Sequence, residues 1–364
     1  MLALIFSLIL HVAAGESINA ALDSARAVYA ARGEQTTIYI APGTYQEELT
    51  IDVPGLRLIN RSKKEPAKIT WYYGHGYQYK SMGDVPNYGG SRTRRWNASV
   101  LVTAPDFYAE NIIFENSFNL YVSEKEATDS LVDISQSDMP WTEKERPKKV
   151  MLPRPKEVGS TEVAKRAYRE RAAAISFTEG AHNAHLKNCT AIGKQDVLYG
   201  DQGASIWWEG GTLSGAVDFI FGAMTLAVDR ATIIANITDE KNDNCYISAG
   251  RSGTEDSIAR GILFYKCHIQ SPVPGRVWLA RPWRWWGETV WAYTTWDEGI
   301  LNAEGWSTGL VKKKEGFNPE NACPNSYEYK SQDNSAGRPK WVTVLQQPIL
   351  PDGTKLTPKS WLRH

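Results

Sequence analysis

The stretch GKQDVLYG at residues 193–200 is followed at residues 215–222 by GAVDFIFG. Both read Gly, two residues, Asp, two apolar residues, an aromatic residue and Gly, at an offset of 22 residues. The match extends toward the N-terminus, where Thr190 corresponds to Thr212. Self-similarity at a period of about 20–25 residues, without helical periodicity, is typical of a solenoid whose units stack on one another.

The segments around this repeat are short runs rich in β-branched and aromatic residues, separated by turn residues. The clearest runs are TTIYI (36–40), LTIDV (49–53), LRLIN (56–60), SVLVTA (99–104) and NIIFEN (111–116). We therefore predict an all-β fold, a parallel β-helix. A sandwich of β-hairpins is the alternative, and it predicts more two-residue turns and less self-similarity at this period.

One helix is predicted ahead of the strands, over Ser17 to Gly33. Ser17 can cap its N-terminus and Gly33 can end it in the left-handed conformation. The apolar residues of one face recur at helical spacing, at Ile18, Leu22, Ala25 and Val28.

The first 14 residues, MLALIFSLILHVAA, form an apolar run that ends in small residues. Such a run is too short to span a bilayer and is typical of a signal peptide, with cleavage expected after Ala14 or Gly15. A buried first helix is the alternative. We assign residues 1–15 to a signal peptide and expect a secreted protein.

Residues 16–364 are predicted to form a single domain, since neither of the two segments that interrupt the repeat looks like a second domain. Residues 123–170 are rich in Lys, Glu, Pro and Arg and are expected to form an excursion with some helix. Residues 310–364 are polar and contain Pro, and we expect this tail to pack along the coil or cap its end.

The charge is balanced, with 41 Lys and Arg against 41 Asp and Glu. This balance gives no reason to expect a nucleic acid or a membrane as partner. The four cysteines lack paired metal-ligand spacing, so we predict no metal site. Cys245 with Cys267 is the preferred disulfide pair if the protein is secreted, and buried free thiols are the alternative.

The two aspartates of the repeat carry the chemical argument. In a solenoid, residues one period apart stack on neighbouring coils about 4.8 Å apart, so Asp196 and Asp218 would be neighbours. Two adjacent carboxylates do not ionise equally, which leaves one as an anion and the other able to hold a proton. Aspartates that only bond backbone in solenoid turns are the alternative.

Two further residues fit this pair. Arg281 follows Asp218 at a distance close to three more periods, and it could orient the Asp218 anion through a bidentate contact. The amide of Gln195, which precedes Asp196, could donate a hydrogen bond to a developing oxyanion.

Four segments resemble, in the same order, the signature blocks of pectin methylesterases, carbohydrate esterase family 8. They are GTYQEE (43–48), GKQDVLYG (193–200), VDFIFG (217–222) and LARPW (279–283). With TAPDFYAENIIFEN (103–116), the resemblance spans about residues 17 to 310. It implies a right-handed parallel β-helix without metal or cofactor.

The resemblance also implies a role for each catalytic residue. Asp218 corresponds to the nucleophile that forms an acyl-enzyme, and Asp196 to the general acid and then base. Gln195 corresponds to an oxyanion-hole amide, and Arg281 to the arginine that binds the nucleophile and the substrate.

Three aromatic residues, Trp283, Tyr199 and Phe221, correspond to those that line the galacturonate-binding cleft. The substrate implied is methylesterified pectin (homogalacturonan), and the products are methanol and free carboxylates. We expect a monomeric enzyme.

One departure concerns the oxyanion hole. The family has a second Gln one repeat length before the Gln-Asp pair, and the equivalent position here is Ala173, in ERAAAISF (170–177). Nearby Arg171, or a residue from the 123–170 excursion, could supply the missing donor. The alternatives are a weakened or inactive relative that binds pectin, or a β-helix enzyme that cleaves the polymer, as pectate lyases and polygalacturonases do.

Overall fold

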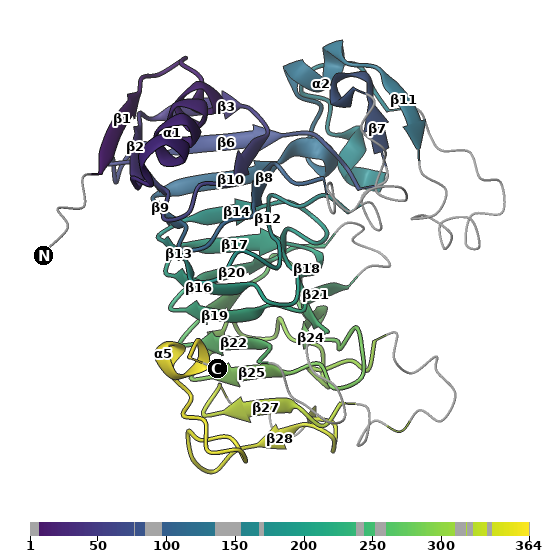
Figure 1. Ribbon diagram of the computed structural model, residues 1–364. Coiled ribbons are helices and arrows are strands. Elements are labelled where there is room, and N and C mark those ends of the chain that lie inside the picture. Colours follow the sequence, from purple (N-terminus) through teal and green to yellow (C-terminus); the bar gives the residue numbers. More distant parts are fainter. Residues whose placement is uncertain are drawn as a thin grey trace, which may run out of the picture.

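A stack of parallel coils forms the body of the protein (Figure 1). The computed structural model describes residues 7–75, 77–83, 97–134, 154–166, 171–237, 244–251, 260–309, 318, 323–332 and 337–363. The coils in the middle of the stack each contribute one strand to each of three parallel sheets, and the chain follows a right-handed parallel β-helix, as predicted.

The three sheets are numbered here by the order in which a coil passes through them. Sheet 1 holds, in spatial order, β1 (Leu8–Val12), β2 (Thr36–Ile40), β5 (Arg57–Ile59), β9 (Tyr108–Glu110), β13 (Ala184–Lys187), β16 (Ser205–Glu209), β19 (Thr225–Asp229), β22 (Ile262–Tyr265), β25 (Thr289–Ala292), β27 (Ser326–Tyr329) and β28 (Thr343–Val344). Sheet 2 holds β3 (Gly43–Gln46), β6 (Ala67–Trp71), β10 (Ile112–Asn116), β14 (Thr190–Ile192), β17 (Thr212–Gly215), β20 (Thr232–Ala235), β23 (His268–Gln270) and β26 (Thr295–Trp296). Sheet 3 holds β4 (Leu49–Ile51), β8 (Val100–Val102), β12 (Ile175–Phe177), β15 (Leu198–Gly200), β18 (Val217–Gly222), β21 (Cys245–Gly250) and β24 (Val277–Ala280).

The repeat read from the sequence corresponds to one coil. Leu198 of β15 pairs with Ile220 of β18, and Thr190 of β14 pairs with Thr212 of β17. The offset of the repeat is therefore the register of these strands, and the solenoid prediction is confirmed.

The corner between sheets 1 and 2 contains a left-handed residue in five successive coils. Asn188, Gly210, Arg230, Lys266 and Tyr293 have φ between 50° and 67°. Their backbone N–H groups donate to the next coil, as from Asn188 to Glu209 O at 2.8 Å. A single left-handed residue turns the chain sharply without breaking the ladder of hydrogen bonds.

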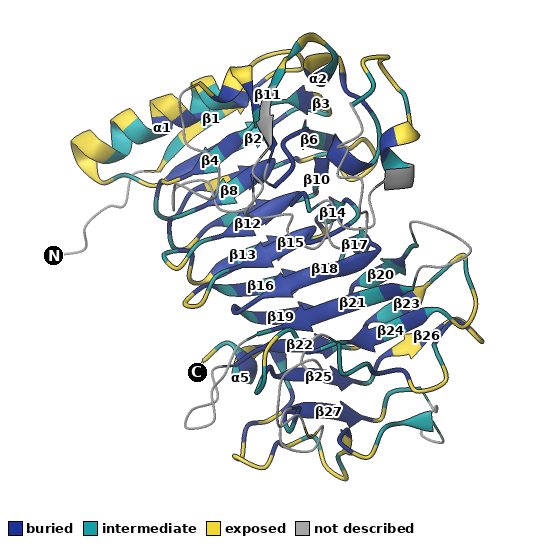
Figure 2. Ribbon diagram, turned by 90° about the vertical axis from the view of Figure 1, so that its right-hand side faces the viewer, coloured by how far each residue is buried: buried dark blue, intermediate teal, exposed yellow. Residues whose placement is uncertain are grey.

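Apolar side chains from all three sheets fill the interior of the coil. The strands of the stack are accordingly coloured mostly as buried in Figure 2. Along sheet 1 they stack in register, for example Leu186 on Trp208 and Phe264 on Trp291. The rings of Phe264 and Trp291 lie 3.7 Å apart at an angle of 5°. Each coil presents apolar side chains to the coils on either side of it. Every pair of neighbouring coils therefore buries apolar surface and stabilises the stack.

Helix α1 (Ile18–Arg32) covers the N-terminal end of the coil, as predicted. The Ser17 side chain accepts a hydrogen bond from Ala20 N, and Gly33 ends the helix with φ 66°. Ile18, Leu22 and Ala25 face the core and are buried, in agreement with the predicted face.

Near the other end, α5 (Pro358–Trp361) packs on the outer side of sheet 1, against β19 and β22. Trp361 is fully buried there and its Nε1 donates to Gly261 O at 3.1 Å. Within the described residues, no helix is long and apolar enough to cross a membrane.

A lateral subdomain projects beside sheet 3 at the N-terminal end of the coil (Figure 1). It contains the antiparallel pair of β7 (Tyr77–Tyr79) and β11 (Leu131–Ile134). Its helical turns are η1 (Lys80–Met82), η3 (Ser117–Asn119), α2 (Glu124–Thr128) and η4 (Glu162–Arg166). Much of the predicted excursion lies here, while its residues 135–153 and 167–170 lie outside the described part of the chain.

The segment assigned to a signal peptide contains a strand in this structure. Leu8–Val12 form β1, which pairs along its whole length with β2, and Val12 is buried. Cleavage after Ala14 or Gly15 would remove β1, so the mature protein would begin at α1. The signal peptide stays a prediction.

The preferred disulfide is wrong, because all four cysteines are free thiols and buried. Cys245 opens β21 in sheet 3, whereas Cys267 lies at the corner between sheets 1 and 2. Their sulfur atoms lie near different backbone carbonyls, those of Gly215 and Val228. Burial raises the pKa of the Cys267 thiol to about 12, which keeps it protonated and unreactive.

Candidate active site

The two aspartates of the repeat lie on neighbouring coils of sheet 3. Asp218 belongs to β18 and Asp196 lies just before β15, and both are 2% exposed. Both have left-handed backbones, with φ 56° at Asp196 and 47° at Asp218. This conformation costs a non-glycine residue roughly 1–2 kcal/mol, least for Asp and Asn, and such strain clusters at functional sites.

Arg281 binds Asp218 through two parallel hydrogen bonds. Its Nε donates to Oδ1 at 2.5 Å and its Nη2 donates to Oδ2 at 2.7 Å. Arg281 follows β24, and its backbone N–H donates to Ser248 O at 2.9 Å. The bidentate contact holds the carboxylate of Asp218 in one orientation.

The path from Asp218 to Arg281 differs from the one predicted. Strand order β18, β21, β24 places Arg281 two coils beyond Asp218 and not three. The coil from β21 to β24 is longer than the repeat, as the pairing of Tyr246 with Trp278 shows. The coil from β18 to β21 is also longer, since Val217 pairs with Tyr246. Both coils carry an insertion that the regular part of the repeat does not contain.

The environment of Asp196 favours the protonated form of its carboxyl. Burial raises the pKa of its carboxyl well above the usual value; the charge of Arg171 opposes this shift, Asp218 adds to it, and Arg281 opposes it. The two aspartates therefore differ in environment, since Asp218 has a bidentate cation and Asp196 is desolvated without one.

Gln195 lies beside this pair and is 8% exposed. It forms an isolated parallel bridge with Val217 of the next coil. Among the residues that the structure describes, none is within hydrogen-bond distance of its buried Oε1. Its side-chain amide is thus a polar group at the site with unused bonding capacity.

The alanine at the position expected for a second glutamine lies beside the aromatic residues of the site. Ala173 is 1% exposed and belongs to one buried cluster with Tyr199 and Phe221. Its neighbour Ala172 donates from its backbone N–H to Gln195 O at 3.2 Å. Neither alanine side chain can donate a hydrogen bond.

Arg171 comes directly before Ala172 and is partly exposed. Its carbonyl accepts from His75 N at 2.7 Å, which fixes its backbone against the lateral subdomain. Its positive charge has the largest effect on Asp196 of any neighbouring charge. Arg171 is therefore close enough to this carboxyl to act on it electrostatically.

The three predicted aromatic residues lie together on the outer side of sheet 3. The Tyr199 and Phe221 rings are 5.6 Å apart, and Trp283 meets Phe221 edge-on at 5.5 Å. Ala173 and Ala249 belong to the same cluster. The backbone N–H of Trp283 donates to Gly250 O at 3.0 Å, which ties this aromatic group to β21.

The sequence reasoning missed three residues next to this site. Tyr199 donates from its hydroxyl to Asp201 Oδ1 at 2.6 Å, and Arg251 Nη2 donates to the same hydroxyl at 3.3 Å. The centroid of the Tyr246 ring lies 3.8 Å from the guanidinium carbon of Arg281. The alternation of buried and exposed positions in β21 could have marked Tyr246 as outward-facing. Its contact with Arg281 could not be predicted from the sequence.

The close approach of neighbouring coils requires glycine at position 222, the last residue of the repeated motif. Its φ is 139°, and a Cβ there would lie 2.1 Å from the carbonyl oxygen of Gly200. The coils can approach at this point only without a side chain. Gly222 follows Phe221 and so sets the close packing next to the aromatic cluster.

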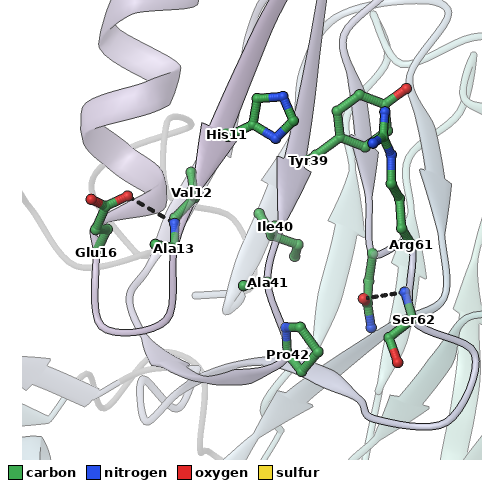
Figure 3. Close-up of a pocket in the computed structure, with 11 residues that line it drawn as sticks. His11, Val12, Ala13, Glu16, Tyr39, Ile40, Ala41, Pro42, Arg61 and Ser62 are labelled. Carbon is green, nitrogen blue, oxygen red and sulfur yellow. Dashed lines mark hydrogen bonds between the residues drawn. The ribbon is translucent and has the colours of Figure 1, made fainter.

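A hollow of about 530 Å³ lies elsewhere, at the N-terminal end of the coil (Figure 3). It is lined by β1, β2 and the segment after β5, and the Arg61 guanidinium covers the Tyr39 ring at 3.6 Å. The carboxylate of Glu16 accepts a hydrogen bond from Ala13 N at 2.8 Å. None of the predicted catalytic residues lies in this hollow.

Comparison with known proteins identifies a family. The Pectinesterase family profile matches residues 160–344, which is half of the chain and includes both aspartates. The chain is also 25% identical over 361 residues to a probable pectinesterase/pectinesterase inhibitor of Arabidopsis thaliana. That match covers 96% of this chain and 48% of the relative, so the chain spans about half of the relative's length.

Solved structures of pectin methylesterases have a fold similar to that of this chain. A pectin methylesterase from carrot superposes with a TM-score of 0.64 at 18% identity, over 97% of this chain and 92% of the other. A pectin methylesterase in complex with a hexasaccharide has a TM-score of 0.63 at 21% identity, over 92% of each chain. These likenesses show that the chain has the fold of these enzymes.

Proposed function

Because the chain belongs to the pectinesterase family, we propose that it hydrolyses the methyl esters of polygalacturonate and releases methanol and free carboxylates. The observation that carries this proposal is the bidentate contact of Arg281 with Asp218, next to Asp196 on the neighbouring coil, whose pKa is raised by burial. It places an oriented anion beside a proton donor, which is the pair that ester cleavage through a covalent intermediate requires.

In the first step, an oxygen of the Asp218 carboxylate attacks the ester carbonyl carbon. The carbonyl π electrons move to its oxygen, which becomes an oxyanion. When this intermediate collapses, the bond to the methoxy oxygen breaks and Asp196 gives its proton to that oxygen. Methanol leaves, and the galacturonyl group remains bound to Asp218 as an anhydride.

In the second step, Asp196 is a carboxylate and takes a proton from water. The hydroxide attacks the carbonyl carbon of the galacturonyl group, and the bond to Asp218 breaks. Asp218 returns as a carboxylate that Arg281 holds, and Asp196 is again protonated. The raised pKa of Asp196 suits both roles, because its carboxyl keeps a proton for the leaving group up to a higher pH and regains one readily from water.

The oxyanion requires hydrogen-bond donors, and Gln195 is the first of them. Losing one such donor costs about 10²–10³ in turnover unless another group takes its place. With alanines at 172 and 173, we propose Arg171 as the second positive group, since its charge reaches Asp196. An arginine there would also attract the acidic polymer.

The proposed substrate is methylesterified homogalacturonan. The cluster of Tyr199, Phe221 and Trp283 suits the apolar faces of sugar rings, and Arg281 and Arg171 suit their carboxylates. The solved relative in complex with a hexasaccharide supports a saccharide ligand at this fold. We propose that the protein acts outside the cell, where this polymer is found, and that it works as a monomer.

One assay tests the reaction. Purified protein is incubated with highly methylated pectin, and methanol, released acid, new reducing ends and unsaturated uronate are measured together. We expect methanol and acid in equal amounts without the other two products. New reducing ends would indicate a polygalacturonase, and unsaturated uronate would indicate a lyase.

A variant tests the assignment of the nucleophile. Asp218→Asn should lower methanol release by more than about 1000-fold, because the amide cannot form the anhydride. Binding of pectin should survive, since the aromatic cluster is unchanged. Near-wild-type turnover of this variant would show that Asp218 is not the nucleophile.

A further inference from the structure

Arg281 must cross a whole coil to reach Asp218. Arg281 follows β24 and Asp218 lies in β18, and β21 lies between them in sheet 3. Two strand spacings amount to about 9–10 Å. A long flexible side chain that spans this distance needs support along its path if its guanidinium is to keep one orientation.

The intervening strand supplies that support. The Arg281 guanidinium carbon lies 3.8 Å from the centroid of the Tyr246 ring, which belongs to β21. The Tyr246 ring also stacks on Trp278 of β24, at 6.1 Å and an angle of 15°. The ring of Tyr246 is therefore in contact with both Arg281 and Trp278.

The strand pairing explains why Tyr246 lies at this place. Val217 pairs with Tyr246, whereas Ile220 pairs with Ser248, so β18 carries one extra residue over this interval. Asp218 lies within that irregular stretch, directly after the residue opposite Tyr246. The backbone N–H of Tyr246 donates to Ala216 O at 2.9 Å, which fixes the strand just before it.

The residue next to the crossing point is small. Ser248 pairs with Ala280, which places Ala249 opposite Arg281. Ala249 is fully buried, and its methyl group leaves room for the side chain of Arg281 to pass over β21. A tyrosine on one side and an alanine on the other thus define one route for the arginine.

We infer that Tyr246 is a positioning residue, whose ring holds the Arg281 guanidinium in the plane from which it binds Asp218 with two hydrogen bonds. This inference rests on the proposed function, because it concerns the orientation of the nucleophile. An arginine stacked on an aromatic face keeps its N–H groups parallel to the ring and directed sideways, where a carboxylate can accept them. The stacked indole of Trp278 limits the movement of the Tyr246 ring.

The role predicts a specific difference between two variants. Tyr246→Phe keeps the ring and should keep kcat within about twofold, since the stack does not need the hydroxyl. Tyr246→Leu removes the ring and should lower kcat about tenfold, with little change of KM. Tyr246→Met introduces a longer and more adaptable side chain than Tyr246→Leu, so it refills more of the space that the ring leaves. Its kcat should be as low as that of Tyr246→Leu, which would show that lost packing alone is not the cause.

A matched control is available on sheet 1. Tyr108 carries Arg57 over its ring at 4.0 Å, the same kind of contact, on a sheet that does not hold the aspartates. Tyr108→Leu should lower the melting temperature as much as Tyr246→Leu and leave kcat unchanged. Equal losses of kcat in both variants would overturn the inference.

Crystal structures of the variants test the inference apart from the reaction. In Tyr246→Leu the Arg281 guanidinium should have left its bidentate contact with Asp218, and in Tyr246→Phe it should keep it. An unchanged contact in the Leu variant, or unchanged kcat, would refute the positioning role. A wild-type protein that releases no methanol would refute the proposed function, and the crystal structures would still decide the role of Tyr246.

Discussion

Asp196 and Asp218 occupy equivalent places on neighbouring coils, yet only Asp218 is bound by an arginine through two hydrogen bonds. Both have left-handed backbones and both are buried to the same extent. The repeat thus provides two similar carboxyl groups, and Arg281 makes them different. That asymmetry separates a charged nucleophile from a protonated acid in the mechanism proposed above.

The charge of Arg171 should be visible in the pH dependence of the reaction. Burial holds the pKa of Asp196 well above the usual value, and Arg171 lowers it. In Arg171→Met that pKa should rise further, so the limb of the rate profile at which Asp196 loses its proton should move to higher pH. Methanol release measured across the acid and neutral range checks the direction.

Arg61→Met is the control for this shift, because Arg61 covers Tyr39 at the N-terminal hollow. Its rate profile should match that of the wild type. A limb that moves to lower pH in Arg171→Met would contradict the proposed place of Arg171.

Glu288 should make the folded protein less stable as the pH rises. Burial raises the pKa of its carboxyl to about 7, opposed by Arg260 and by the Gly261 N–H and assisted by Asp352. The folded state therefore binds more protons than the unfolded chain between about pH 4.5 and pH 7. Across this window the free energy of unfolding should fall by about 3 kcal/mol.

Urea unfolding at several pH values measures this fall. In Glu288→Gln the fall should shrink by about the same amount, because the amide does not titrate. Glu304→Gln changes an exposed carboxyl and should keep the wild-type dependence. An equal fall in wild type and Glu288→Gln would assign the effect to another group.

Gly222 should tolerate no side chain. Its φ of 139° opposes any substitution, and so does the carbonyl oxygen of Gly200, which would lie 2.1 Å from an added Cβ. Gly222→Ala should cost more than about 3 kcal/mol of stability. Gly275→Ala is the control, since Gly275 also has a positive φ, of 70°, but open space around it, and it should cost about 1 kcal/mol. Thermal unfolding of the two variants compares them directly.

The N-terminus of the exported protein decides between the signal peptide and β1. We expect N-terminal sequencing after secretion from a eukaryotic or bacterial host to begin at Gly15 or Glu16. The mature protein would then lack β1, and β2 would become the edge of sheet 1. A sequence that begins at Met1 would show that the first strand is retained and that the segment is not a signal peptide.

Much of the fold could be predicted because the local pattern and the stacking agree. Ser17 and Gly33 carry the signals that begin and end α1, and these signals act within a few residues. The repeat at residues 193–222 predicted the register of β15 and β18, because two coils of equal length must place equal residues side by side.

The prediction of the site was weaker where the coils differ in length. The pairing of Ile175 with Leu198 makes the coil from β12 to β15 one residue longer than the repeat, which the repeat itself did not predict. Arg281 was expected three periods beyond Asp218 and lies two coils away. The cysteines could not be paired from their spacing, since Cys245 and Cys267 lie in different parts of the coil's cross-section.

The sequence by itself determined the solenoid, the capping helix and the two aspartates as neighbours, because each follows from a repeated or local pattern. Only the tertiary structure decided that Arg281 reaches Asp218 from two coils away, and that Tyr246 lies against it. The physical reason is that two side chains on different coils meet only if the corners of the chain between them contain the right number of residues. A change of one residue in any corner moves a side chain to a different neighbour.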